Sequence, residues 1–166
     1  MRKNIVLIGM AGAGKSTLGV LLAKALGMDF LDSDIVIQKT DGRKLQEILD
    51  QDGMDAFLQI EEDVLCAICV ENTVIATGGS AVYSNLAMEH LKQNGIVVYL
   101  DVPFPELQKR LTNIKTRGIA IRKGHTLQDV FNERLALYKK YAHITVDCVN
   151  MTVEQNVEQI IAALED

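Results

Sequence analysis

The 166-residue sequence has no tryptophan, two prolines and three cysteines. So small and odd a number of cysteines gives no disulfide framework, and a hydrophobic core has to hold the fold together. Cys66 and Cys69 form a CxxC pair, but no second pair or nearby histidine in the sequence completes a metal site. Because the pair falls in a stretch with the pattern of an amphipathic helix, we predict that both thiols belong to the core.

Long apolar runs and an excess of positive charge are also missing. No run approaches the roughly 18 apolar residues that cross a membrane, and the apolar run near the N-terminus is too short for a signal peptide. With 17 basic and 22 acidic residues, the net charge of -5 argues against a nucleic-acid partner. The sequence therefore predicts a monomeric, single-domain, cytoplasmic protein, residues 1–166, without membrane or nucleic-acid partners.

Apolar, β-rich runs alternate with helical patterns along the chain. The apolar runs are typical of parallel strands covered on both faces, and we expect five of them, at 4–9, 29–32, 73–77, 95–101 and 143–147. Helical patterns cover 15–26, 35–50 with a break at Asp41-Gly42, 54–70, 85–92, 106–111, 127–141 and 153–164. This alternation predicts an α/β fold of three layers, with a five-stranded parallel sheet flanked by helices.

The segment GMAGAGKS, residues 9–16, matches the phosphate-binding P-loop pattern GxxxxGK[ST] between a predicted strand and a predicted helix. Its glycines let backbone N–H groups point at phosphate oxygens, and the helix adds the positive end of its dipole. We expect Lys15 to reach the β- and γ-phosphates and Ser16 to ligate Mg²⁺. The predicted ATP-binding residues are Gly9, Gly12, Ala13, Gly14, Lys15, Ser16 and Thr17.

The class of nucleotide protein follows from what accompanies the P-loop. A GTPase needs a guanine-reading NKxD or TKxD element, which the sequence lacks, and a motor ATPase needs a longer chain. Residues 107–128 hold six basic residues and no acidic one, which is typical either of a solvated loop or of a lid that closes over ATP. A small-molecule kinase is favoured, and a nucleotide-dependent switch module is the alternative from another class.

An ordered set of motifs over nearly the whole chain resembles the shikimate kinase family. The motifs are GMAGAGKST at 9–17, DSD at 32–34, GRKLQEI at 42–48, DGMDAFLQIEEDV at 52–64, ATGGSAV at 76–82, TRGIA at 116–120 and ERLALY at 133–138. The resemblance implies the P-loop kinase fold, with a substrate-binding insertion at about 34–62 and a lid at about 112–125. It also implies ATP- and Mg²⁺-dependent transfer of the γ-phosphate to a hydroxyl of shikimate, a step of aromatic amino acid biosynthesis.

The resemblance also implies roles for single residues. Asp34 orients the acceptor hydroxyl and takes its proton, whereas Asp32 joins Ser16 in holding Mg²⁺. Arg117, from the basic lid, contacts the phosphates during catalysis together with Lys15. The competing interpretation of Asp34 is an ordinary cap of the helix predicted from residue 35.

Gly78, Gly79 and Arg134 are implied to bind the acceptor, with Arg134 gripping its carboxylate through a bidentate fork. The competing interpretations are a strand-end turn for the two glycines and a surface ion pair for Arg134.

Leu58 and Ser80 are among the positions that depart from the family pattern. Leu58 stands where the family has a second carboxylate-binding arginine, although the flanking Phe57 and Glu61 match, and Ser80 replaces a glycine. Losing one charge-assisted contact typically costs about 1.5–3 kcal/mol. The acceptor is therefore predicted to be shikimate, and another small hydroxy acid or polyol stays open as the alternative.

Overall fold

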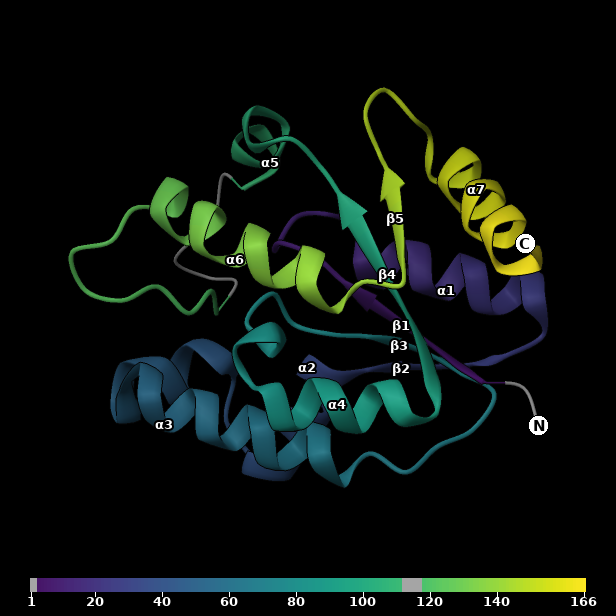
Figure 1. Ribbon diagram of the computed structural model, residues 1–166. Helices are drawn as coiled ribbons and strands as arrows, with labels where there is room; N and C mark the ends of the chain where they lie inside the picture. Colours follow the sequence, from purple (N-terminus) through teal and green to yellow (C-terminus); the bar gives the residue numbers. More distant parts are fainter. Residues whose placement is uncertain (1–2, 112–117) are drawn as a thin grey trace.

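A five-stranded parallel sheet forms the centre of the computed structural model, which describes residues 3–111 and 118–166 (Figure 1). The strand order is β2-β3-β1-β4-β5. The strands are β1 (Asn4–Ile8), β2 (Asp29–Asp32), β3 (Thr73–Ala76), β4 (Gly95–Asp101) and β5 (Ile144–Asp147). All five lie within one residue of the predicted bounds, and the predicted fold class is confirmed.

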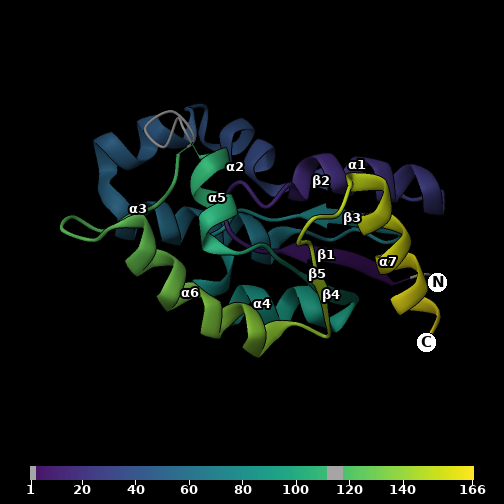
Figure 2. The ribbon, with the colours of Figure 1, turned by 90° about the horizontal axis from the view of Figure 1, so that it is seen from above.

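The helices form the two outer layers of the fold. In Figures 1 and 2, α1 and α7 lie together on one face of the sheet, and α4 and α6 lie on the other. Helix α2 and the first part of α3 lie beyond the carboxyl ends of the strands, and the rest of α3 runs back alongside α4. The helices in the described residues are α1 (Lys15–Leu26), α2 (Ser33–Asp41), α3 (Leu45–Ala67), α4 (Asn85–Gln93), α5 (Phe104–Arg110), α6 (Leu127–Tyr141) and α7 (Val153–Glu165), with a short 3-10 helix η1 (Ala81–Tyr83).

Strand β1 lies at the centre of the core. It pairs with β3 on one side and with β4 on the other, and all five of its residues are buried. A strand with helices over both faces has no solvent-facing side, which explains its unbroken apolar sequence. The carboxyl end of β1 is therefore held firmly in the middle of the sheet, directly before the P-loop.

The helical segment 35–67 differs from the prediction in three ways. Helix α2 begins at Ser33, and its cap is Asp32, whose Oδ1 accepts a hydrogen bond from the Asp34 amide, so Asp34 is not the cap. The predicted break at Asp41-Gly42 is present between α2 and α3. Helix α3 runs from Leu45 to Ala67, and the gap expected between residues 50 and 54 is reduced to a kink at Gly53, at φ 84°. This left-handed backbone angle is a conformation that glycine adopts without a steric penalty.

The placement of the CxxC pair in the core is wrong for Cys69 and holds in part for Cys66, which packs against the edge of the core. Helix α3 ends before Cys69, which is exposed, and Cys66 is half-buried. Burial is found instead at Cys148, beside the end of β5.

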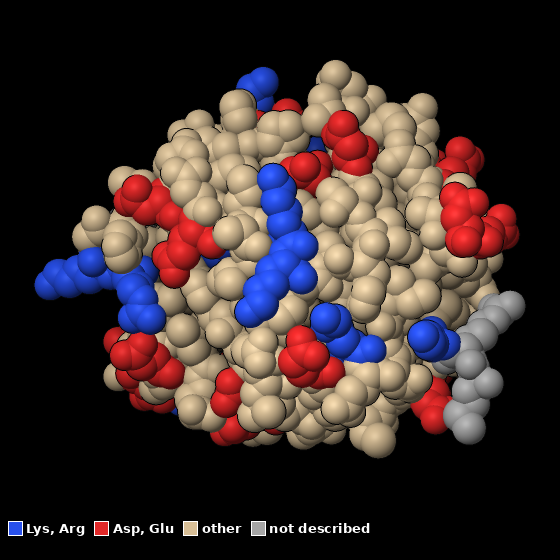
Figure 3. Space-filling view, viewed as in Figure 1, with Lys and Arg blue, Asp and Glu red and all other residues tan. Residues whose placement is uncertain are grey.

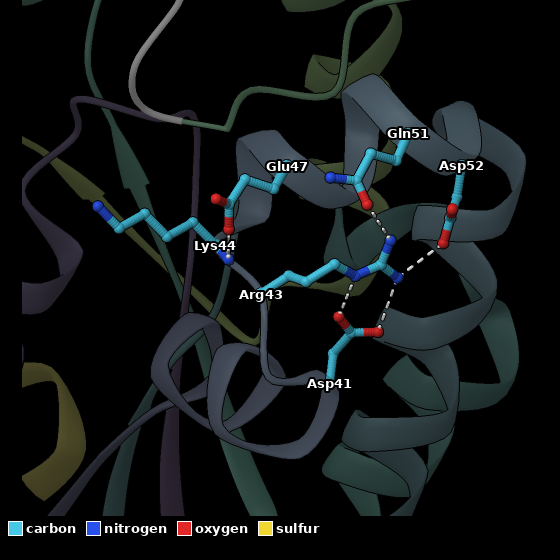
Figure 4. Close-up of polar contacts among 6 residues, drawn as sticks. All are labelled: Asp41, Arg43, Lys44, Glu47, Gln51 and Asp52. Carbon is cyan, nitrogen blue, oxygen red and sulfur yellow. Dashed lines mark hydrogen bonds and ion pairs between the residues drawn. The ribbon is translucent and has the colours of Figure 1, made fainter.

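The turn between α2 and α3 is tied together by Arg43 (Figure 4). Its guanidinium forms two hydrogen bonds with Asp41, at 2.6 and 3.0 Å, and a third with Asp52 at 2.7 Å. Gln51 accepts a further hydrogen bond from Arg43 at 3.1 Å. The network fixes the end of α2 against the stretch of α3 that precedes the bend at Gly53, and so sets the direction in which the rest of α3 leaves.

Charged side chains of both signs are interspersed on the face drawn in Figure 3, in keeping with the net charge of -5. Among the helices of the described residues, none has the combination of length and hydrophobicity that crossing a membrane requires.

The side chain of Asn4 joins the start of β1 to the start of β3, and its contribution to stability can be tested. Its buried side chain accepts a hydrogen bond from the Thr73 amide at 3.0 Å and donates one to the Val70 carbonyl at 2.7 Å. Asn4→Ala leaves both backbone groups without these partners, and we expect a loss of about 2–3 kcal/mol in the free energy of unfolding. Urea denaturation measures this loss in the free energy of unfolding. The exposed Asn132→Ala is the matched control and should change stability by less than about 0.5 kcal/mol.

Candidate active site

A cavity of about 680 Å³ opens at the carboxyl ends of the central strands, where ligands bind in open α/β sheets. It is bordered by the P-loop, by the first turn of α2, by the turn after β3 and by residues of α5 and α7. The residues predicted from the sequence that line it are Gly12, Ala13, Gly14, Lys15, Ser16, Thr17, Asp34, Gly78 and Gly79. Gly9, at φ 148°, lies just behind them at the end of β1.

The P-loop has the geometry of an anion cradle. Gly14, at φ 90° and ψ 20°, is the cap of α1, so the first amides of this helix face the cavity. Lys15 follows directly and is buried, with its ammonium group donating to the carbonyls of Gly9 at 2.6 Å and Met10 at 2.7 Å. Burial lowers the pKa of Lys15 to about 8, although the negative charge of Asp34 opposes this shift. The site thus holds a poorly solvated cation that an incoming phosphate can pair with.

Asp32 joins the P-loop to the start of α2. Its Oδ2 accepts a hydrogen bond from the Ser16 hydroxyl at 2.6 Å, while its Oδ1 caps α2. A hydroxyl and a carboxylate side by side suit Mg²⁺, which prefers oxygen ligands and keeps much of its hydration. No group of three or more His, Cys, Asp or Glu side chains in the described residues is arranged to hold a metal ion, so the two oxygens of this pair would need phosphate and water as further ligands.

Asp34 faces the cavity from the first turn of α2. Burial raises the pKa of its carboxyl group to about 6, the charge of Asp32 adds to the rise, and Lys15 opposes it. A carboxyl group with this pKa can accept a proton from a nearby hydroxyl near neutral pH.

Arg134 is fully buried on α6, so it does not form the surface ion pair considered above. Its guanidinium donates to the Ala120 carbonyl at 2.7 Å and to the Tyr83 hydroxyl at 3.3 Å. It packs so closely on Gly79 that a Cβ there would lie 2.8 Å from Nη1. Arg134 lines a smaller adjoining cavity, and Asp34, Gly78 and Gly79 line both cavities.

Two residues without a predicted role also belong to this region. Glu61 is buried on α3, and its Oε1 accepts a hydrogen bond from the Ser80 hydroxyl at 2.6 Å. Tyr138, one turn after Arg134 on α6, donates to the Gly79 carbonyl at 2.6 Å and stacks on Tyr99. The signal for Glu61 was present in the sequence, since it stands four residues after Phe57 and thus on the same face of a helix.

The sequence profile of the shikimate kinase family matches residues 11–165. The chain belongs to the shikimate kinase family. Shikimate kinase 2 of Enterobacter sp. (strain 638) is 36% identical over 99% of this chain and 97% of its own length. Shikimate kinase of Bacillus anthracis (strain CDC 684 / NRRL 3495) is 35% identical over 95% of this chain and 96% of its own.

The structure of shikimate kinase from Acinetobacter baumannii in complex with shikimate is similar over 99% of this chain and 94% of that one, at a TM-score of 0.90 and 33% identity. Membership of the shikimate kinase family makes the protein a phosphotransferase with an alcohol group as acceptor. The family implies ATP as the phosphate donor and Mg²⁺ as the usual cofactor.

The loop at 118–126 covers the smaller cavity from the side of α3. Ala120 is buried among residues of α2 and α3, and Arg122 forms an ion pair with Asp55 at 3.1 Å. Gly118 lies so close to Leu45 that a Cβ at Gly118 would be 2.4 Å from the Leu45 Cβ. Arg117 lies outside the described residues.

Leu58, the main departure from the family pattern, is half-buried on α3. It lines a side cavity of about 150 Å³ together with Glu61, Ser80 and Tyr83, and it packs on the apolar cluster around Phe57. No positively charged side chain is among the residues that line this side cavity.

The bond from Tyr138 to Gly79 should matter for acceptor binding, because it fixes the backbone on which Arg134 packs. Tyr138→Phe removes this hydrogen bond, and we expect the KM for the acceptor to rise several-fold with a loss of about 1 kcal/mol in stability. Tyr141→Phe is the matched control on the same helix, since the Tyr141 hydroxyl donates to Asn85 at 2.8 Å. Equal KM values for the two variants would contradict a role of Tyr138 at the site.

Proposed function

We propose that this protein transfers the γ-phosphate of ATP to a hydroxyl group of shikimate. The observation that carries the proposal is the shared lining of the two cavities. Asp34, Gly78 and Gly79 face both the P-loop cavity and the cavity next to Arg134, so a phosphate donor and an anionic acceptor would meet at Asp34. We call Asp34, Gly78, Gly79 and Arg134 the acceptor site.

The P-loop residues supply binding and charge in this mechanism. The amides at the start of α1 hold the phosphates, and the Lys15 ammonium exchanges its carbonyl partners for phosphate oxygens. Ser16 and Asp32 would hold Mg²⁺, which when bound neutralises phosphate charge and orients the nucleotide. Phosphoryl transfer has a loose transition state, so positioning and charge neutralisation contribute more than proton removal.

Asp34 and Arg134 position the acceptor. Asp34 accepts a hydrogen bond from the reacting hydroxyl and takes its proton as the new P–O bond forms. Arg134 holds the carboxylate with the Nη1 hydrogens, which face Gly79. Arg117 is proposed to reach the phosphates from a lid at about 112–125, and the segment at about 34–62 to be the substrate-binding insertion.

The oligomeric state and location belong to the same proposal. We propose a cytoplasmic monomer; no helix of the described residues could cross a membrane.

A second acceptor class is favoured by one observation, the leucine at position 58. With one arginine facing the carboxylate, the site would also suit a less anionic hydroxy acid or a polyol. The test is ATP turnover with shikimate and with a panel of hydroxy acids and polyols. Clear turnover of another acceptor and none of shikimate would overturn shikimate as the acceptor, and the assignment as a kinase would stand. ATP hydrolysis that no acceptor stimulates would favour a nucleotide switch.

Lys15→Met tests the phosphate site. The buried ammonium is expected to pair with the transferred phosphate, so its loss should lower kcat by roughly 100-fold or more. The apolar methionine fills much of the same space, and the circular dichroism spectrum should not change. Lys24→Met, at the exposed end of the same helix, is the matched control and should keep wild-type turnover. Near wild-type turnover of purified Lys15→Met would refute the assignment.

A further inference from the structure

Glu61 is a buried carboxyl group at the edge of the acceptor site. Its side chain is 2% exposed, and its Oε2 has no hydrogen-bond partner among the described residues. A Cβ built on Gly78 would lie 3.0 Å from this oxygen and 2.7 Å from Oδ1 of Asp34. The two carboxyl groups therefore flank the same glycine, and Oε2 faces the backbone on which the acceptor is proposed to lie.

Glu61 has a neutral partner where a cation would ordinarily be expected. Its Oε1 is held by the Ser80 hydroxyl, and no ion pair to Glu61 occurs among the described residues. Leu58, three residues earlier on α3, is close enough to line the same side cavity but carries no charge. Ser80 and Leu58 thus together leave a carboxyl group that is fixed in place but not neutralised.

Charged groups from three other elements act on Glu61. Burial raises the pKa of its carboxyl group to about 7, and the negative charge of Asp34 on α2 adds to this rise. The Ser80 hydrogen bond and the positive charges of Arg134 on α6 and Lys15 on α1 oppose it. Asp55 and Glu62, on α3 itself, line the side cavity and are also acidic. Glu61 is consequently neutral in mildly acidic solution and negatively charged in mildly basic solution.

We propose that Glu61 is a specificity-determining residue of the acceptor site, and that its protonation state sets the affinity for an anionic acceptor. This inference rests on the function proposed above. When Glu61 is neutral, it does not offset the positive charge of Arg134, which then attracts the acceptor carboxylate in full. When Glu61 is ionised, it repels that carboxylate and partly offsets the charge of Arg134. Low pH therefore favours an anionic acceptor, and the advantage disappears as the pH rises through the pKa of Glu61.

The test is the Kd of shikimate, measured by calorimetry between pH 6 and 8.5. An ordinary carboxyl group stays ionised over this range, so the charge of the ligand does not change. For the wild type we expect Kd to rise about tenfold, which corresponds to a coupling of one pKa unit. Glu61→Gln keeps the size of the side chain and should show a clearly smaller rise, because only the titration of Lys15 and Asp34 then remains. The part of the rise that the substitution removes is the part that depends on Glu61.

Two further variants sharpen the result. Glu62→Gln removes the neighbouring carboxylate from the side cavity and should keep the wild-type pH dependence. Leu58→Arg places a cation beside Glu61, so binding should become tighter above pH 7 and nearly independent of pH.

If Glu61→Gln does not fold, ¹³C NMR of the wild-type glutamate carboxyl groups replaces it. The pKa of the group that titrates near neutral pH should then shift upward by about one unit when shikimate binds.

The outcomes separate this inference from the function on which it rests. Turnover of shikimate with a Kd that does not change with pH, or an equal rise of Kd in Glu61→Gln, overturns the role of Glu61 and leaves the kinase intact. Absence of shikimate turnover at every pH overturns the proposed acceptor instead.

Discussion

The pairing of β1 with both β3 and β4 is the constraint on which the site depends. The chain leaves β1 toward β2 on one side of the sheet, whereas it leaves β3 toward β4 on the other. At such a switch point the connections diverge and open a crevice at the carboxyl ends of the strands. The P-loop follows β1 and the Gly78-Gly79 turn follows β3, and a Cβ on Gly79 would lie 3.2 Å from the Ala11 amide. The two binding segments therefore meet because their strands are neighbours.

Several charged groups are buried together in the crevice, and burying any one of them alone would cost more free energy. Lys15, Glu61 and Arg134 are buried, and Asp34 is half-buried beside them. Removing such groups from water costs free energy, and each of them is stabilised in part by the opposite charges of the others. The pKa shifts of Lys15, Asp34 and Glu61 record this balance, because burial opposes the charged form in all three. The site is thus kept at some cost to the stability of the fold, as is common for catalytic centres.

The fold and the phosphate-binding half of the site could be predicted from the sequence because their signals are local. Strand and helix periodicities and the P-loop pattern each lie within a short stretch, and the structure places the predicted elements and loop accordingly. The bond between Ser80 and Glu61 joins residues 19 positions apart, and the one between Tyr138 and Gly79 joins residues 59 apart. Contacts of this kind depend on how helices pack on the sheet, which no local pattern encodes. The misplaced Cys69 has a similar cause, since the apolar pattern does not fix where α3 ends.

Asp32 has a consequence for how variants of this enzyme are interpreted. One of its oxygens caps α2 and the other meets Ser16, so a single carboxylate connects the nucleotide side of the crevice to the helix that carries Asp34. A substitution at Asp32 therefore perturbs two processes at once, and its kinetic effect is a mixture of metal coordination and helix placement. Ser16→Ala removes the hydroxyl and leaves the cap of α2 intact, so its kinetic effect does not include the placement of that helix.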